Sequence, residues 1–151
     1  MDEITSKLMR YCVYQERCRK EVTEKLREWD LEDEDKEDII TFLEEEGFLN
    51  EDRFARAFAG GKFRVKRWGR MKIRRELQKK GLDEATIAAG IQVEIPEEDY
   101  WQAAGEWIEK KAGSITGKSS FERKGKLSRF LLQKGFEWDV IHEVLKEKGF
   151  E

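Results

Sequence analysis

The sequence predicts an all-α protein made of three tandem three-helix units, similar to helix-turn-helix domains, that together form an elongated, curved molecule. Three observations predict this fold. Charged residues make up 42% of the 151 residues and hydrophobic residues 38%, with a single proline, which favours many short helices with solvated faces. Apolar residues recur at helical spacing along the chain. One helix pattern also returns with a period of about fifty residues, as in repeat proteins.

The clearest helix lies within Arg67–Leu82, where Ile73 and Leu77 are four residues apart and share one face. Gly81 follows at the place where a left-handed residue commonly ends a helix, so Leu82 can fold back onto the last turn. The opposite face carries a cationic stripe formed by Lys72, Arg75 and Lys79. We therefore expect a helix with one core side and one positive side.

The same pattern occurs twice more and divides the chain into units 1–48, 49–95 and 96–151. In the last unit, the residues that correspond to Ile73, Leu77 and Gly81 are Leu127, Leu131 and Gly135. In the first unit, the corresponding residues are Val22, Leu26 and Asp30. Three-helix units of this size bury little apolar area alone, so we expect them to stack end to end and share a core.

The first unit is expected to contain a helix marked by Leu8 and Cys12, a second helix over Arg19–Trp29 and a third over Lys36–Glu45. The acidic run Glu32–Asp38 is most simply a solvated loop that leads into the third helix. A docking surface for a basic partner is the alternative interpretation of this run.

In the second unit, Asn50 is expected to cap a helix whose apolar stripe is formed by Phe54, Ala55, Phe58 and Ala59. The pair Gly60-Gly61 is expected to weaken this helix near its end. The basic helix described above follows, and Asp83 can cap the third helix.

The third unit begins at Pro96, which suits a helix start. Its first helix has Trp101, Ala104 and Ile108 on one face. A Gly/Ser/Thr-rich linker over 112–120 leads to the predicted helices Glu122–Lys134 and Trp138–Lys148.

The net charge of −3 hides an uneven charge distribution. Ten Lys or Arg residues and one acid, Glu76, lie between Lys62 and Lys80, and the region Lys118–Lys134 is also basic. Such local fields attract a polyanion whatever the overall charge. The residues predicted to bind nucleic acid or a protein–nucleic-acid filament are Arg67, Arg70, Lys72, Arg74, Arg75, Lys79, Lys124, Lys126 and Arg129.

Two observations favour binding over an ordinary solvated face. Few acids are interleaved with these cations, and the stripe recurs in the third unit as Lys126 and Arg129. In the first unit the sign is inverted, because the places of Lys72, Arg75 and Lys79 hold Glu21, Glu24 and Glu28. We therefore expect the second and third units to face the polyanion. The five tryptophans are expected in the core or at interfaces between the repeats rather than as platforms for stacking bases, with Trp68 as the exception because it lies at the start of the basic helix.

The sequence indicates no catalytic residue, metal site or cofactor. Residues 112–119 fit a relaxed phosphate-loop pattern around Lys118, but a helical segment precedes them where such a loop needs a strand. An ATPase is the alternative that Lys118→Ala would test. His142, the only histidine, has no partners at metal-ligand spacing. Cys12 and Cys18 match no metal spacing and are expected to be free thiols in a reducing cytoplasm.

No apolar run approaches the length of a membrane-spanning helix. The N-terminal residues 1–6 also lack a basic region followed by an apolar one, so we expect no secretory signal. Together these features predict a cytoplasmic protein with no membrane contact, which we expect to be a monomer.

Three segments resemble the signatures of the RecX family of bacterial recombination regulators. They are Gly47–Ala55, Trp68–Leu82, and Lys126–Phe136 followed by Asp139-Val140-Ile141. The segments occur in the family's order and the resemblance covers nearly the whole chain. It implies a tandem three-helix-repeat fold and binding in the groove of RecA–DNA filaments. It also implies inhibition of RecA ATP hydrolysis, strand exchange and co-protease activity, without catalysis by the regulator itself.

A second function remains open on the same residues. A module of the helix-turn-helix type can bind single- or double-stranded DNA without a protein partner, through the second helix of each unit. A gel shift against bare DNA, with and without RecA, separates the two interpretations.

Overall fold

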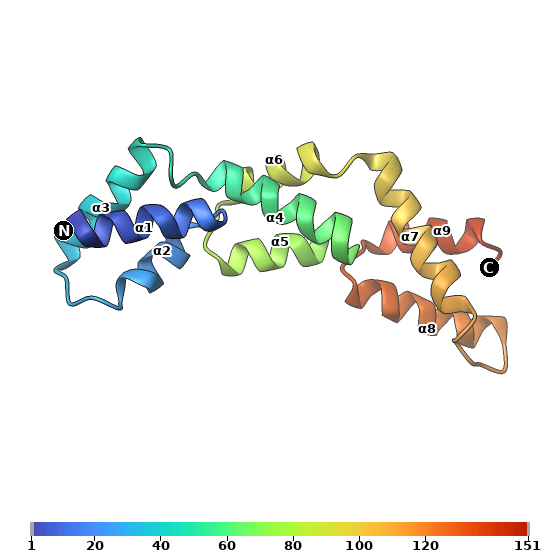
Figure 1. Cartoon of the computed structure of the whole chain (residues 1–151). Coiled ribbons are helices and arrows are strands. Elements are labelled where there is room, and N and C mark those ends of the chain that lie inside the picture. Colours follow the sequence, from blue (N-terminus) through green and yellow to red (C-terminus); the bar gives the residue numbers. More distant parts are fainter. Residues whose placement is uncertain (1, 151) are drawn as a thin grey trace.

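The computed structural model describes residues 2–150, which form nine α-helices and no strand. Three consecutive groups of three helices follow one another along an elongated molecule, with its termini at opposite ends (Figure 1). The prediction of an all-α tandem-repeat fold is therefore confirmed. The helices are α1 (Asp2–Tyr14), α2 (Arg19–Leu26), α3 (Asp33–Glu45), α4 (Glu51–Lys66), α5 (Arg70–Lys79), α6 (Glu84–Glu94), α7 (Glu97–Ala112), α8 (Ser120–Gln133) and α9 (Trp138–Glu147).

The second helices of the three units, α2, α5 and α8, follow one another along one long edge of the molecule (Figure 1). The end of α8 meets the start of α5: the backbone N–H of Gly69 donates to the carbonyl of Lys134 at 2.6 Å, and that of Met71 donates to Gly135 at 2.9 Å. Amides that the first turn of α5 leaves free are thus satisfied by carbonyls at the end of α8. This contact fixes the second unit against the third.

The apolar core has two parts. The first unit has its own cluster, formed by Leu8, Cys12, Val22, Leu26, Ile39, Ile40, Leu43 and Leu49. The second and third units share a larger cluster, in which Ile73 and Leu77 of α5 lie with Leu127 and Leu131 of α8. Cys18, at the start of α2, also belongs to this shared cluster, so it links the first unit to the other two.

Local capping signals in the sequence are confirmed. The side chain of Asn50 accepts a hydrogen bond from the backbone of Arg53 at 2.9 Å, and Asp83 accepts one from Thr86 at 2.8 Å. Gly81 has a φ of +83°, the left-handed conformation expected of a residue that ends a helix. These features position the ends of α4, α5 and α6.

Two predictions for the first unit were wrong. Helix α2 ends at Leu26, short of Trp29, and a turn follows. The acidic run is helical from Asp33 onward rather than a loop. Three carboxylates in the first turn of α3 complement the positive end of the helix dipole, which explains why the charged run starts a helix.

Helix α4 also runs further than expected, through Gly60-Gly61 to Lys66. Its core side is packed against α6, where a Cβ added to Gly90 would lie 3.0 Å from the Cβ of Ala55. Tertiary packing therefore outweighs the low helix propensity of the two glycines. As a result α4 carries Lys62 and Lys66 to the start of the basic helix α5. Within residues 2–150, no helix has both the length and the apolar character needed to cross a bilayer.

Candidate functional site

The connection between α4 and α5 is held in a fixed conformation. Arg67 has a φ of 54°, which is uncommon for a residue with a side chain and costs about 1 kcal/mol or more. Its carbonyl accepts a hydrogen bond from the indole N–H of Trp107 on α7 at 2.9 Å. The following residue, Trp68, is thereby placed between α4 and α5, where it contacts Phe58, Lys62 and Lys72.

Trp68 is the centre of a first cluster of aromatic rings and lysines. It packs edge-to-face against Phe58, with ring centroids 6.3 Å apart, and both rings rest on the shared core. The ammonium groups of Lys62, Lys66 and Lys72 lie 5.0, 6.0 and 4.5 Å from the centroid of the Trp68 ring. At these distances a cation is attracted by the face of an indole ring.

A second cluster of the same kind lies on the third unit. Trp107 and Phe130 pack edge-to-face with centroids 5.3 Å apart. The ammonium groups of Lys110 and Lys134 lie 5.5 and 4.6 Å from the centroid of Trp107, and that of Lys111 lies 4.7 Å from Phe130. The outer sides of both aromatic pairs are therefore lined by cations.

The two clusters adjoin at the contact between units two and three. Lys134 accepts the backbone hydrogen bond from Gly69, and Gly135 lies directly against Lys72. We call the combined surface the lysine–aromatic surface. It consists of Phe58, Trp68, Trp107 and Phe130 with Lys62, Lys66, Lys72, Lys110, Lys111 and Lys134.

Among the side chains that the structure describes, no carboxylate oxygen lies within 4.0 Å of any of these six ammonium groups. Several lysines elsewhere in the protein are paired with acids: Lys25 lies 2.7 Å from Glu28, and Lys80 lies 3.2 Å from Glu21. The positive charge of the lysine–aromatic surface is therefore available to an external anion.

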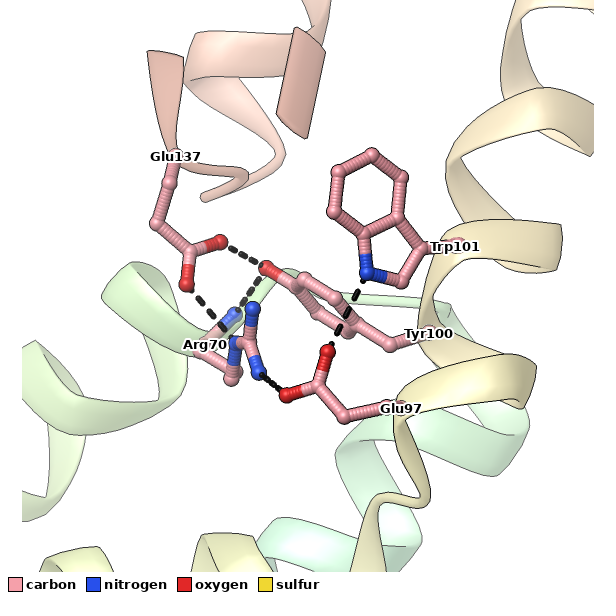
Figure 2. A network of polar contacts seen from close by, with 5 residues as sticks. All are labelled: Arg70, Glu97, Tyr100, Trp101 and Glu137. Atoms are coloured by element: carbon pink, nitrogen blue, oxygen red, sulfur yellow. Dashed lines mark hydrogen bonds and ion pairs between the residues drawn. The ribbon is translucent and has the colours of Figure 1, made fainter. Parts of the chain in front are cut away.

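Arg70 serves a different purpose from the one predicted. Its guanidinium binds Glu97 at 2.6 Å and Glu137 at 2.7 Å, its backbone N–H donates to the Tyr100 hydroxyl at 2.9 Å, and that hydroxyl donates to Glu137 (Figure 2). The indole of Trp101 donates to the outer oxygen of Glu97 at 3.1 Å. Arg70 thus joins the start of α5 to α7 and α9, and its side chain is only 19% exposed. Little of the Arg70 guanidinium is therefore accessible to a ligand.

The charges of this network determine the ionisation of its members. Burial alone would lower the pKa of Arg70, but its hydrogen bond to Glu97 and the charge of Glu137 outweigh burial and raise that pKa above its ordinary value. The hydrogen bond from Arg70, assisted by Trp101, lowers the pKa of Glu97. Burial, together with the hydrogen bond to Glu137, raises the pKa of Tyr100 far above its ordinary value. The network is therefore a charged clamp at neutral pH.

The other predicted residues divide into two groups. Four have an acidic neighbour: Arg67 with Glu106, Arg74 with Glu84, Lys79 with Glu76, and Lys126 with Glu122. The other four predicted residues, Lys72, Arg75, Lys124 and Arg129, have no carboxylate at salt-bridge distance within residues 2–150. Of the nine, the structure brings Lys72 into the lysine–aromatic surface.

Sequence reasoning missed the five other lysines of that surface. It searched for cations on the second helix of each unit, where it still passed over Lys134 at the end of α8. Lys62 and Lys66 lie on α4, and Lys110 and Lys111 on α7, which are first helices. The spacing of four between Lys62 and Lys66, just before Trp68, was the available signal. The inverted charges of the first unit are partly used inside the protein, since Glu21 pairs with Lys80.

Residues 112–119 connect α7 to α8, so two helices flank the segment that fits a phosphate-loop pattern. The side chain of Ser119 accepts a hydrogen bond from the backbone of Glu122 and caps α8. The strand that a phosphate loop requires is replaced by a helix, and the local geometry is that of a helix–helix linker.

Three RecX models match the chain in order: the first three-helix domain over residues 6–43, the second over 50–91 and the third over 97–145. The chain belongs to the RecX family. The resemblance noted in the three sequence motifs is thereby confirmed. Membership supports a regulatory role, because the curated relatives are RecX regulatory proteins.

One such relative, the regulatory protein RecX of Clostridium acetobutylicum, is 33% identical over 134 residues, which are 87% of this chain and 62% of that protein. The RecX of Halalkalibacterium halodurans is 34% identical over 139 residues, which are 92% of this chain and 52% of that protein. The chain thus spans about half to three-fifths of the length of these curated RecX proteins.

Solved RecX structures have the same fold. The crystal structure of RecX from Lactobacillus salivarius matches with a TM-score of 0.87 and 25% identity, over 97% of this chain and 94% of that chain. A second crystal structure, of a regulatory protein RecX, matches with a TM-score of 0.86 over 96% of this chain and 72% of that one. At 22% identity, the second match concerns the fold alone.

Proposed function

We propose that this RecX-family chain binds RecA nucleoprotein filaments and lowers their ATPase, strand-exchange and co-protease activities, without catalysis of its own. Family membership supports a regulatory role. The single observation that carries the mode of binding is the lysine–aromatic surface, with six ammonium groups that have no carboxylate partner within the described residues.

The chemistry of this surface suits the phosphate backbone of DNA or an acidic protein surface within a filament. Lysines that contact phosphates release condensed counterions, and this release drives binding at low salt. The elongated molecule (Figure 1) can lie along a filament, where successive units meet successive parts of one groove. A rigid junction between units two and three keeps both lysine clusters facing the same ligand.

Cations on the second helices α5 and α8 support the same proposal. Arg75 on α5 and Arg129 on α8 are both exposed, so both can add positive charge toward an anionic ligand. The first unit presents the exposed Glu24 at the corresponding place, and like charge repels a phosphate backbone. We propose that the first unit faces basic protein surface or solvent.

A second candidate function is DNA binding that needs no RecA, and the same unpaired lysines favour it. The two functions differ in what a gel shift shows. With RecA-coated single-stranded DNA, the first proposal expects a supershift at protein concentrations that leave bare DNA unshifted. Equal affinity for bare DNA and for the filament would instead favour the second function.

A further inference from the structure

An open groove lies between α8 and α9, at the C-terminal end of the molecule in Figure 1. It has a volume of about 340 Å³. Its walls are mainly apolar, and the side chains of Phe121 and Trp138 are 84% and 58% exposed. Lys124 and Arg129 lie at the same groove. Large exposed aromatic side chains beside cations mark a surface that a partner covers.

The internal repeats show what lies beside this place in the other two units. Lys124 of α8 corresponds in the repeat to Arg70 of α5 and Arg19 of α2. Arg70 binds Glu97, the first residue of α7, at 2.6 Å. The backbone N–H of Arg19 donates to Glu51, the first residue of α4, at 3.0 Å. At both inner sites the first residue of the next unit's first helix is thus an acid that contacts this position, through the side chain of Arg70 and through the backbone of Arg19. The guanidinium of Arg19 pairs instead with Glu37 and Glu44 of α3.

The corresponding cavity of the second unit confirms the equivalence. It is lined by Arg70, Arg74 and Ala88, which correspond to Lys124, Ser128 and His142 at the groove of the third unit. Pro96 and Glu97, at the start of α7, form its opposite wall. The groove of the third unit is thus lined by residues that correspond to those of the second unit's cavity. Within the described residues, no helix start lies opposite them.

The groove also differs from its counterpart in one respect. Phe121 and Trp138 stand at places that hold Arg67 and Glu84 in the second unit. The groove of the third unit is therefore more apolar than its counterpart in the second unit, while Lys124 keeps the positive charge. Its complement is a helix start that carries both carboxylates and an apolar side chain.

We propose that this groove binds a helix of a partner protein whose first turn carries two or more carboxylates and whose following turn carries an apolar side chain. Lys124 pairs with the carboxylates, as Arg70 pairs with Glu97. Phe121 and Trp138 pack on the apolar side chain. This interaction uses a different surface from the lysine–aromatic surface and does not depend on RecA binding.

A labelled peptide tests the proposal on the full chain. The probe has the sequence of residues 96–112, which begins with Glu97, Glu98 and Asp99 after a proline. A matched control peptide replaces these three acids by Gln, Gln and Asn. Fluorescence anisotropy is expected to show saturable binding of the acidic peptide and at least about fivefold weaker binding of the control.

Variants of the chain locate the site. Lys124→Glu is expected to lower the affinity for the acidic peptide at least about fivefold. A peptide with lysines in place of its three acids should then bind this variant more tightly than it binds the wild type. Trp138→Ala should lower the affinity for both peptides, because each uses the apolar side of the groove. Lys118→Glu is the matched control, because it makes the same charge change on an exposed side chain outside the groove and should leave affinity unchanged. Circular dichroism confirms that each variant is folded.

Several outcomes would overturn the proposal. They are no saturable binding up to about 1 mM peptide, equal affinity for both peptides, or no effect of Trp138→Ala. Self-association in sedimentation velocity that Trp138→Ala abolishes would assign the groove to a second copy of the chain. Displacement of the peptide by a single-stranded oligonucleotide, in a manner that Trp138→Ala removes, would assign it to nucleic acid.

Discussion

The backbone N–H of Gly69 donates to the carbonyl of Lys134 at 2.6 Å, across the boundary between the second and third units. This bond places the end of α8 against the start of α5. Trp68 lies two residues before the start of α5, and Lys134 lies over Trp107, so the same contact brings the two lysine clusters together. The lysine–aromatic surface therefore depends on a backbone contact that admits no side chain at residue 69.

Gly69→Ala is expected to destabilise the protein by about 1–3 kcal/mol, because a Cβ there would lie 2.2 Å from the carbonyl carbon of Gly135 and the backbone must shift. Gly61→Ala is the control: a Cβ at this helical position meets nothing within 4 Å and should stabilise by up to about 1 kcal/mol. Denaturant unfolding measures both. Equal effects would show that the junction between the units is not tightly packed.

The assignment of faces on α5 and α8 predicts which substitutions damage the fold. Leu77→Ala and Leu131→Ala remove fully buried side chains and are expected to cost about 2–5 kcal/mol each. Lys72→Ala, on the outer face, should cost less than about 0.5 kcal/mol. Chemical denaturation in which Lys72→Ala is as damaging as Leu77→Ala would mean that the faces are reversed.

The clamp around Arg70 predicts a contribution to stability that depends on pH. The pKa of Glu97 is lowered in the folded state from its ordinary value of 4.5, chiefly by the hydrogen bond from Arg70. Its stabilising contribution is therefore complete above pH 4.5 and is lost as the pH falls through the lowered pKa. The free energy of unfolding should decrease less with acidification in Glu97→Gln than in the wild type.

Glu98→Gln is the matched control for that measurement, because Glu98 lies in the same helical turn, is exposed and has no salt-bridge partner in the described part of the chain. It should keep the acid sensitivity of the wild type. Identical pH profiles for Glu97→Gln and the wild type would contradict the clamp.

Binding to DNA or to the filament is expected to weaken with salt. Replacement of Lys62, Lys66 and Lys72 by alanine should lower the slope of log K against log salt by about one for each phosphate that the variant no longer binds. Fluorescence anisotropy at several salt concentrations measures the slope. Replacement of Glu24 and Glu28 by glutamine is the comparison in the first unit and should not weaken binding to bare DNA. A weaker affinity there would contradict the proposed division between the units.

Local features of the fold could be predicted from the sequence because they depend on neighbouring residues. The Asn50 and Asp83 caps bond residues three positions away, and Gly81 ends the helix that precedes it. The acidic start of α3 is also a local feature. Its high charge was interpreted as a loop, because the stabilising effect of carboxylates at a helix start was not considered.

The site was harder to predict because its members are distant in sequence. Arg70 is basic and lies on the positive helix, but its partners are Glu97, Tyr100 and Glu137, which only the packing of α7 and α9 brings to it. Lys134, at the end of α8, reaches Trp107 of α7 for the same reason. A charge pattern shows where cations are abundant, whereas the fold decides which of them are already paired.

The measurement that most directly tests the central claim is a titration of the chain into a single-strand-dependent RecA ATPase assay. The wild type is expected to lower the rate, and the variant with Lys62, Lys66 and Lys72 replaced by alanine should require at least about tenfold more protein for the same effect. A variant with Arg10, Arg27 and Lys36 replaced by alanine makes the same charge change in the first unit and should match the wild type. An unchanged rate with the wild type, or equal potency of the two triple variants, would contradict the account.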